Sequence, residues 1–263
     1  MMKKPILADS HCHLDMLDLS LFEGSLENVF RHAHDEWVEY FLCVAVTPTQ
    51  HDVLLDIANR FENVSLSVGS HPNNPKEESI SLETLLDLAK IPKVVAIGET
   101  GLDYYRSHGD LRWQQERFEV HIEAAKRCHK PLIVHSREAK HDTISILKTH
   151  QNDAIEGVFH CFAGDWEMAK FGLDLGFYIS FSGVVTFKNA TLLQEIAKQV
   201  PLDRMLIETD CPYLAPVPFR GKPNCPGYVR YVAEFIAFLK QKTFEEVAAQ
   251  TTQNYLTLFH KSG

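Results

Sequence analysis

Eight short apolar runs, with helical segments between them, constrain the fold of this sequence more than any other feature. The runs are rich in Val, Ile and Phe, and their alternation with amphipathic segments is the pattern of βαβ units and a parallel sheet. The expected strands are residues 6–8, 41–46, 64–68, 94–97, 132–134, 157–159, 177–181 and 205–207. Between them, residues 110–129 form the longest expected helix.

The chain length and the spacing of these runs favour one closed barrel. A chain of 263 residues is long enough for two small domains or for one large α/β barrel. Eight strands correspond to ~33 residues per repeat, close to the ~30 of one βα unit with its loops. No Gly/Ser-rich linker or charge run divides the chain, so we expect an α/β fold, a (β/α)8 TIM barrel formed by a single domain over residues 1–263. Residues 244–259 are expected to form an extra C-terminal helix.

An open, doubly wound sheet is the structural alternative. It has little support, because no GxGxxG or P-loop fingerprint follows any of the apolar runs.

Composition excludes several classes of protein. With 45% hydrophobic and 23% charged residues, the chain is too apolar and too weakly charged to be disordered. The longest stretch without Asp, Glu, Lys or Arg is 247–260, 14 residues, whereas a membrane span needs ~18 or more apolar residues. Only residues 6–8 form an apolar stretch before Asp9, so we expect no signal peptide, no membrane partner and a cytoplasmic location.

The net charge restricts how the chain could bind nucleic acid, and the cysteine spacing indicates the oxidation state of the thiols. A net charge of −9 argues against loose coating of nucleic acid, which depends on clustered Lys and Arg. Any nucleic acid must therefore be held locally. The six cysteines form no CxxC pair, so we expect reduced thiols. No obligate protein partner is evident.

Metal-competent side chains follow five of the eight expected strands. In a barrel of this kind the active site lies at the carboxyl ends of the strands, so these side chains should meet at one face. They are His11, His13, Glu99, His135, His160 and Asp210.

The spacing of these residues suits metal binding. His11 and His13 lie two apart in an extended chain, so both imidazoles point to one side and can share an ion, while Cys12 points away and is expected to pack. Burying the Glu99 carboxylate at the barrel mouth costs several kcal/mol unless it is paired or bound to metal. Its two oxygens can bridge cations ~3.5–4 Å apart. An ion pair between Glu99 and a neighbouring Arg is the alternative.

Two acids follow the last strand, Glu208 and Asp210, and they face the same way. One can be a metal ligand and the other can orient a ligating imidazole. Four imidazoles with two carboxylates suit Zn²⁺, Mn²⁺ or Fe²⁺, and suit Mg²⁺ less well because it prefers oxygen and water.

Five motifs together resemble one family. HCHLD, GETGLDYY, PLIVHSREA, HCFAG and ETDCPYLAP, in this order, resemble the TatD family of metal-dependent deoxyribonucleases, within the amidohydrolase-like barrels. The resemblance extends from Asp9 to the C-terminal helix. It implies two divalent cations, with Zn²⁺, Mn²⁺ and Mg²⁺ among the candidates. It also implies their ligands: His11, His13, Glu99 and Asp210 for one cation, and Glu99, His135 and His160 for the other.

The sequence departs from the family pattern at two places. Thr100 stands where the family usually has Ile, and GSHPNN around His71 matches only the GxHP core of the third-strand motif. Neither departure touches an expected ligand, so they bear on substrate preference rather than on metal chemistry.

These observations predict a divalent-metal-dependent phosphodiester hydrolase that acts on DNA. Asp210 is the expected general base for the attacking water. Short, local contacts on an acidic molecule suit single-stranded DNA ends, and the resemblance implies 3′ to 5′ exonuclease or abasic-site activity for some members. Four residues are expected to contact phosphates, and three aromatic residues on the same loops could either stack bases or pack the loops themselves. They are His71, Arg137, Arg220 and Lys222 for phosphates, and Tyr104, Tyr105 and Phe162 for bases.

Two other functions remain open from the sequence. The same two-metal site could serve a small-molecule hydrolase that cleaves an amide, ester or phosphoester. A binding or scaffold protein that keeps the site for stability would hold metal without turnover. Loss of nuclease activity on replacing Arg137 or Arg220 would distinguish a polyanionic substrate from a small molecule.

Overall fold

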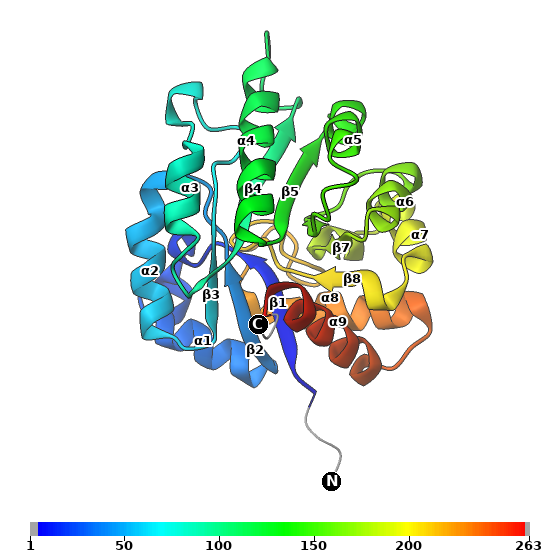
Figure 1. Ribbon diagram of the computed structural model, residues 1–263. Helices are drawn as coiled ribbons and strands as arrows, with labels where there is room; N and C mark the ends of the chain where they lie inside the picture. The colour runs from blue at the N-terminus through cyan, green and yellow to red at the C-terminus, as the bar shows by residue number, and fades with distance from the viewer. Residues whose placement is uncertain (1–4, 261–263) are drawn as a thin grey trace.

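A computed structural model describes residues 5–260 and shows one eight-stranded sheet in which the strands run parallel, in the order β1 to β8 (Figure 1). Parallel strands joined by helices need a right-handed crossover each time, and eight of them in sequence order give the expected barrel. The strands are β1 (Leu7–Cys12), β2 (Val38–Cys43), β3 (Val64–Val68), β4 (Val94–Asp103), β5 (Leu132–Arg137), β6 (Gly157–Phe159), β7 (Tyr178–Phe181) and β8 (Met205–Ile207).

The barrel closes between β8 and β1, just beyond the end of β8. The backbone N–H of Asp210 donates to the carbonyl of His11 over 2.9 Å, and that of His13 donates to the carbonyl of Cys211 over 2.9 Å. Inside, the buried Asp9 carboxylate accepts the backbone N–H of Thr209 at 2.9 Å and its hydroxyl at 2.5 Å. This seam joins the first and last strands and sets His11 beside Asp210.

Helices cover the outside of the sheet (Figure 1). Alternate strand residues point outward into an apolar layer against these helices, and the others point into the barrel. The helices are α1 (Leu26–Asp35), α2 (His51–Arg60), α3 (Leu82–Leu88), α4 (Arg112–Cys128), α5 (Lys140–Thr149), α6 (Trp166–Asp174), α7 (Thr191–Gln199), α8 (Val229–Lys240) and α9 (Phe244–Phe259).

The extra C-terminal helix, α9, plugs the end of the barrel where the strands begin. Its Tyr255, Leu258 and Phe259 pack against the inward-facing strand residues. The Asn254 side-chain amide donates to the carbonyl of Met205 at the start of β8, over 2.7 Å. The amino-terminal end of the barrel is therefore sealed, which leaves the carboxyl-terminal end for a site.

The fold agrees with the expected architecture, and the main differences are strand lengths. Strands β3, β6 and β8 and helix α9 have the expected bounds, and α4 is shorter than expected at both ends. Strand β2 begins and ends three residues earlier than expected, β7 begins one residue later, and β1, β4 and β5 run on through polar residues. Apolar runs define only the part of a strand that packs against other apolar groups, and the polar continuations carry the site.

All six cysteines are free thiols. Within residues 5–260 no helix combines the length and the apolar character that a membrane crossing requires.

Candidate metal centre

Glu99 stands at the centre of the predicted cluster. It lies inside β4 rather than after it, because that strand continues to Asp103. Imidazoles from four other strands or strand ends surround its carboxylate, which is almost completely buried. The nearest nitrogen-to-oxygen distances to Glu99 are 2.7 Å for His160, 3.0 Å for His135, 3.3 Å for His11 and 3.3 Å for His71.

Asp210 completes the other side of the cluster. Its Oδ1 lies 3.4 Å from His13 Nε2 and 3.7 Å from His11 Nε2. Asp210 adopts a left-handed backbone conformation, with φ of 55°, a region that Asp tolerates better than most residues. All six predicted ligands therefore meet at the carboxyl end of the barrel.

Two glycines allow the backbone to place Glu99. Gly98 and Gly101 have φ values of 144° and 124°. A side chain at Gly101 would put a Cβ 2.1 Å from the carbonyl oxygen of His135, and one at Gly98 would put a Cβ 2.7 Å from that of Ile133. The glycines of GETGLD are needed because β4 approaches the backbone of β5 too closely for a Cβ.

In three histidines, the ring nitrogen on the side away from the cluster faces a hydrogen-bond acceptor. His13 Nδ1 lies 2.9 Å from the carbonyl of Val44, and His160 Nδ1 lies 3.4 Å from the Glu208 carboxylate. His135 is turned the other way, with Nε2 3.1 Å from the Asp103 carboxylate. A nitrogen that donates to an acceptor carries the proton, so with a cation bound in the cluster each of these rings would offer it the lone pair of its other nitrogen.

The residues fit divalent metal ions. Within residues 5–260, both nitrogens of the buried His11 and Nε2 of His160 form no hydrogen bond of good geometry, although Glu99 oxygens lie 3.3 Å from His11 Nε2 and 2.7 Å from His160 Nε2. Buried polar atoms without such bonds cost free energy unless something binds them. Ligand-type atoms lie within 4.8 Å of one another in each of three overlapping groups. These groups are His11, His13 and Glu99; His11, His160 and Asp210; and His71, Glu99 and His135.

Opposite charges hold both carboxylates of the cluster in the anionic form. Burial alone would raise the pKa of Glu99, but the surrounding histidines, His160 foremost, bring it well below its ordinary value. Burial would likewise raise the pKa of Asp210, and His13 and His11 lower it. Although burial alone would lower it, the same carboxylates raise the pKa of His160, His135 and His13. Two buried carboxylates that stay ionised need positive charge beside them, which protonated imidazoles supply here and which a divalent cation would supply instead.

Sequence reasoning missed Asp103. It ends β4 in the GETGLD motif, and its buried carboxylate contacts His135 Nε2 at 3.1 Å and accepts Asn73 Nδ2 at 2.9 Å. Its other oxygen accepts the backbone N–H groups of Tyr105 and Arg106. The signal was available, because Asp103 lies four residues after Glu99 and so on the same side of the strand.

Glu208, by contrast, was expected as one of the two acids after β8. It is completely buried and lies behind His160, where it also accepts the backbone N–H of Cys161 at 2.8 Å. Its position suits an orienting residue, whereas Asp210 faces the imidazoles.

Arg137, Arg220 and Lys222, which were predicted to bind phosphate, are exposed. The Arg137 guanidinium lies 3.9 Å from the ring centre of Tyr105, and that of Arg220 lies 4.3 Å from the ring centre of Phe187. Within residues 5–260 no carboxylate lies within ion-pair distance of any of these three cations, and both guanidinium groups rest on aromatic faces.

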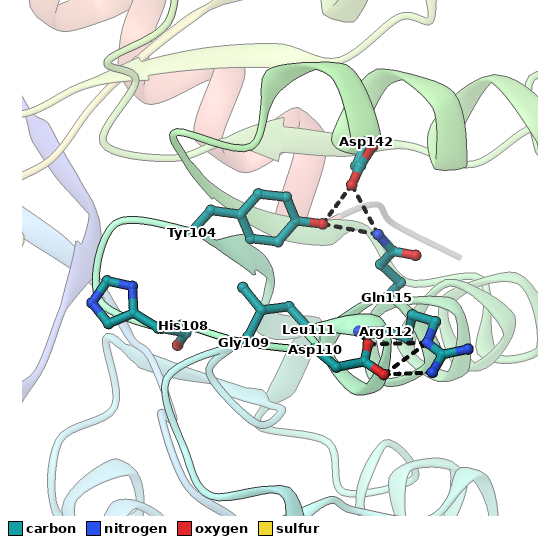
Figure 2. Close-up of a pocket in the computed structure, with 9 residues that line it drawn as sticks. Tyr104, His108, Gly109, Asp110, Leu111, Arg112, Gln115 and Asp142 are labelled. Atoms are coloured by element: carbon teal, nitrogen blue, oxygen red, sulfur yellow. Dashed lines mark hydrogen bonds and ion pairs between the residues drawn. The ribbon is translucent and has the colours of Figure 1, made fainter.

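The predicted aromatic contacts differ in exposure. Tyr105 is 52% exposed, whereas Phe162 is only 4% exposed and packs in the core, so for Phe162 the structure agrees with packing and not with base stacking. Figure 2 shows that the Tyr104 hydroxyl points to Asp142 and Gln115 in a shallow surface pocket; it donates to Asp142 over 2.6 Å. Tyr104 remains a predicted contact.

Comparisons with known proteins agree with the motifs and the fold. The family model described as TatD related DNase matches residues 8–260. The chain is 48% identical over 254 residues to a protein of Escherichia coli strain K12 named uncharacterized metal-dependent hydrolase YcfH, covering 97% of this chain and 96% of that one. It is 31% identical over 250 residues to the 3′-5′ ssDNA/RNA exonuclease TatD of Salmonella typhimurium, covering 92% and 96%.

A solved structure is similar over the same length. The crystal structure of YJJV, a TatD homolog from Escherichia coli K12, superposes with a TM-score of 0.86 at 28% identity, covering 97% of this chain and 98% of that one. With the family model and these relatives matching nearly the whole sequence, the chain belongs to the TatD-related DNases, a family of metal-dependent hydrolases.

Proposed function

We propose that this hydrolase cleaves phosphodiester bonds at single-stranded DNA ends, removing nucleotides in the 3′ to 5′ direction with two bound divalent cations. The observation that carries the proposal is the gathering of six predicted ligands, from five strands, around Glu99 and Asp210 at the open end of the barrel. His11, His13, Glu99 and Asp210 would hold one cation, and Glu99, His135 and His160 the other. Such cations lower the pKa of a water and neutralise charge on phosphoryl oxygens.

Asp210 has the position of a general base. Its carboxylate lies at the edge of the cluster, and its side chain is 15% exposed. It therefore faces both the histidines and the space from which a water would approach. Because its pKa is held below the ordinary value, it is ionised and can accept the proton of the attacking water.

Cationic and aromatic side chains at the mouth suit a short stretch of nucleic acid. Arg137 lies at the carboxyl end of β5, two residues beyond His135; among the described residues no carboxylate pairs with it, so it can contact a phosphate. Tyr105 beside it offers a ring for base stacking. With a net charge of −9, a long duplex would meet repulsion, so contacts to a few nucleotides favour strand ends. The relative named as a 3′-5′ ssDNA/RNA exonuclease supports this substrate and direction.

The test combines metal analysis with end-labelled substrates. Purified protein is analysed for metal content and assayed on 3′-labelled and 5′-labelled single strands, with chelator and with metal added back. We expect about two equivalents of divalent metal, loss of activity with chelator, and early release of the 3′ label. Release of the 5′ label first would contradict the direction.

A small-molecule substrate is the competing outcome. Arg137→Ala and Arg220→Ala should weaken nuclease activity if the substrate is a polyanion. If both variants cleave oligonucleotides like the wild type, the two arginines do not contact the substrate. If only small esters are hydrolysed, the nuclease proposal is wrong.

A further inference from the structure

We propose that His71 is a hydrogen-bond donor to the substrate rather than a metal ligand, although its ring lies among the ligands. The inference rests on the proposed function for the identity of the substrate. By distance alone His71 qualifies as a ligand, since it forms a possible metal-binding group with Glu99 and His135. The hydrogen bond on the side of its ring away from Glu99 decides whether His71 is a metal ligand or a hydrogen-bond donor.

His71 Nδ1 accepts the backbone N–H of Asn73 over 3.0 Å. A nitrogen that accepts a hydrogen bond cannot carry a proton, so the proton of the neutral ring is on Nε2. That nitrogen faces the cluster, 3.3 Å from Glu99 Oε1. Metal coordination through Nε2 would require its lone pair, which the N–H bond occupies.

The contrast holds for three of the four predicted histidine ligands. The rear nitrogens of His13, His135 and His160 face a carbonyl, Asp103 and Glu208, which are acceptors. On the corresponding side of His71 the neighbouring group is a donor, the backbone N–H of Asn73. The surroundings therefore favour the opposite tautomer at His71: in the neutral ring its proton faces the cluster, whereas the other three neutral rings would present a lone pair to a bound cation.

Helix α4 holds the loop that carries His71. Three buried side chains one helical turn apart reach it: Arg117 donates to the carbonyl of His71 at 2.8 Å, and His121 Nε2 accepts the backbone N–H of Ser70 at 3.0 Å. Gln114 donates to the carbonyl of Pro72 at 3.0 Å. Arg117 is buried and bonds only to carbonyls and to the hydroxyl of Ser79, so its charge is used to fix the loop backbone.

A donor fixed in this way suits an oxygen that gains negative charge. Preorganised N–H groups aimed at such an oxygen lose no free energy to reorganisation during the reaction, and removing one costs roughly 100- to 1000-fold in kcat. In the proposed reaction the oxygen belongs to the phosphoryl group beside Glu99. His71 is then a catalytic residue, although its position among the predicted ligands suggests a metal ligand.

Three measurements on the metal-loaded protein test this role. Long-range ¹H–¹⁵N spectra of the wild type, assigned with His71→Gln, should show the Nε2–H tautomer for His71. His71→Leu should keep the wild-type metal content and lower kcat roughly 100-fold or more. His71→Gln keeps an N–H at the same reach along the side chain and should recover at least part of that loss.

Two control variants show what loss of a metal ligand and a neutral substitution each do to metal content and kcat. His13→Gln, at a predicted ligand, should lose metal, while His34→Gln, on the partly exposed helix α1, should match the wild type in metal content and kcat. An Nδ1–H tautomer at His71, or loss of a metal equivalent in His71→Leu, would overturn the inference. If the wild type cleaves no phosphodiester, the proposed function fails, yet the tautomer and metal content still decide whether His71 is a donor or a ligand.

Discussion

At the scale of single residues, Glu99 connects the two halves of the predicted metal site, since its carboxylate approaches imidazoles from four separate segments of the chain. Glu99→Gln preserves the shape but replaces one anionic oxygen with an amide that cannot bridge cations. We expect metal affinity to fall by more than about 100-fold, the upper end of what outer partners of ligands contribute. Metal content after dialysis measures this. Glu195→Gln, on exposed α7, is the matched control, and equal metal content in both variants would disprove the bridging role.

Asp210→Asn tests the proton acceptor. The amide cannot take a proton from water, so we expect kcat on a labelled oligonucleotide to fall roughly 100- to 10,000-fold. The melting temperature of the metal-free protein should change little, because the backbone N–H that Asp210 donates to His11 is unaffected. Wild-type turnover by Asp210→Asn would rule this residue out as the base.

Asp103→Asn tests the acid that sequence reasoning overlooked. One carboxylate oxygen binds two backbone N–H groups while the other faces His135 and Asn73. An amide in its place must turn an NH₂ group toward the donors on His135 and Asn73. We expect metal affinity to fall about 10- to 100-fold, measured by competition with a chelator. Asp87→Asn on exposed α3 is the control, and unchanged affinity in Asp103→Asn would show that His135 needs no such partner.

At the scale of whole elements, the sequence predicts strands well where they are apolar and poorly where they carry the site. Strands β1 and β4 extend through Asp9 to Cys12 and through Gly98 to Asp103, and nearly all of these residues are buried despite their polarity. A hydrophobic pattern ends at the first polar side chain, whereas the ladder continues because hydrogen bonds and ion pairs satisfy those groups. The six ligand candidates could be predicted because each follows an apolar run. Asp103 could also have been found from its place four residues after Glu99, whereas its contact with His135 and the tautomer of His71 could not, because both depend on contacts that only the folded structure shows.

Helix α4 provides a prediction at this scale, because its His121 is buried and neutral. Burial lowers the pKa of His121 to about 4, from an ordinary value of 6.5. Below pH ~6.5 the unfolded chain takes up a proton that the folded chain does not, so stability falls as the pH drops toward 4. This contribution amounts to about 3 kcal/mol. Denaturant midpoints at pH 4 to 7 should therefore depend less on pH in His121→Gln than in the wild type, and identical slopes would contradict the assignment.

At the scale of the whole molecule, we propose that the chain is one domain. Hydrogen bonds between the end of β1 and the segment just after β8 join the two ends of the sequence, and α9 packs against the starts of both strands. Cutting the chain anywhere within the barrel would open the sheet and expose edge strands. The site depends on this closure, because its ligand candidates come from β1 at one end of the sequence and from the segment after β8 at the other.

The overall charge of the molecule sets how its DNA binding should respond to salt. With a net charge of −9 and three predicted phosphate-binding cations, Arg137, Arg220 and Lys222, few counterions are released on binding. For single strands the slope of log K against log salt is about −0.7 per neutralised phosphate, which gives about −2 here. Fluorescence anisotropy of metal-loaded Asp210→Asn with oligonucleotides of increasing length measures it. We expect the slope to stay constant beyond a few nucleotides, because contacts are confined to the barrel mouth. A slope steeper than about −5, or one that grows with length, would show an extended binding surface and exclude recognition of strand ends alone.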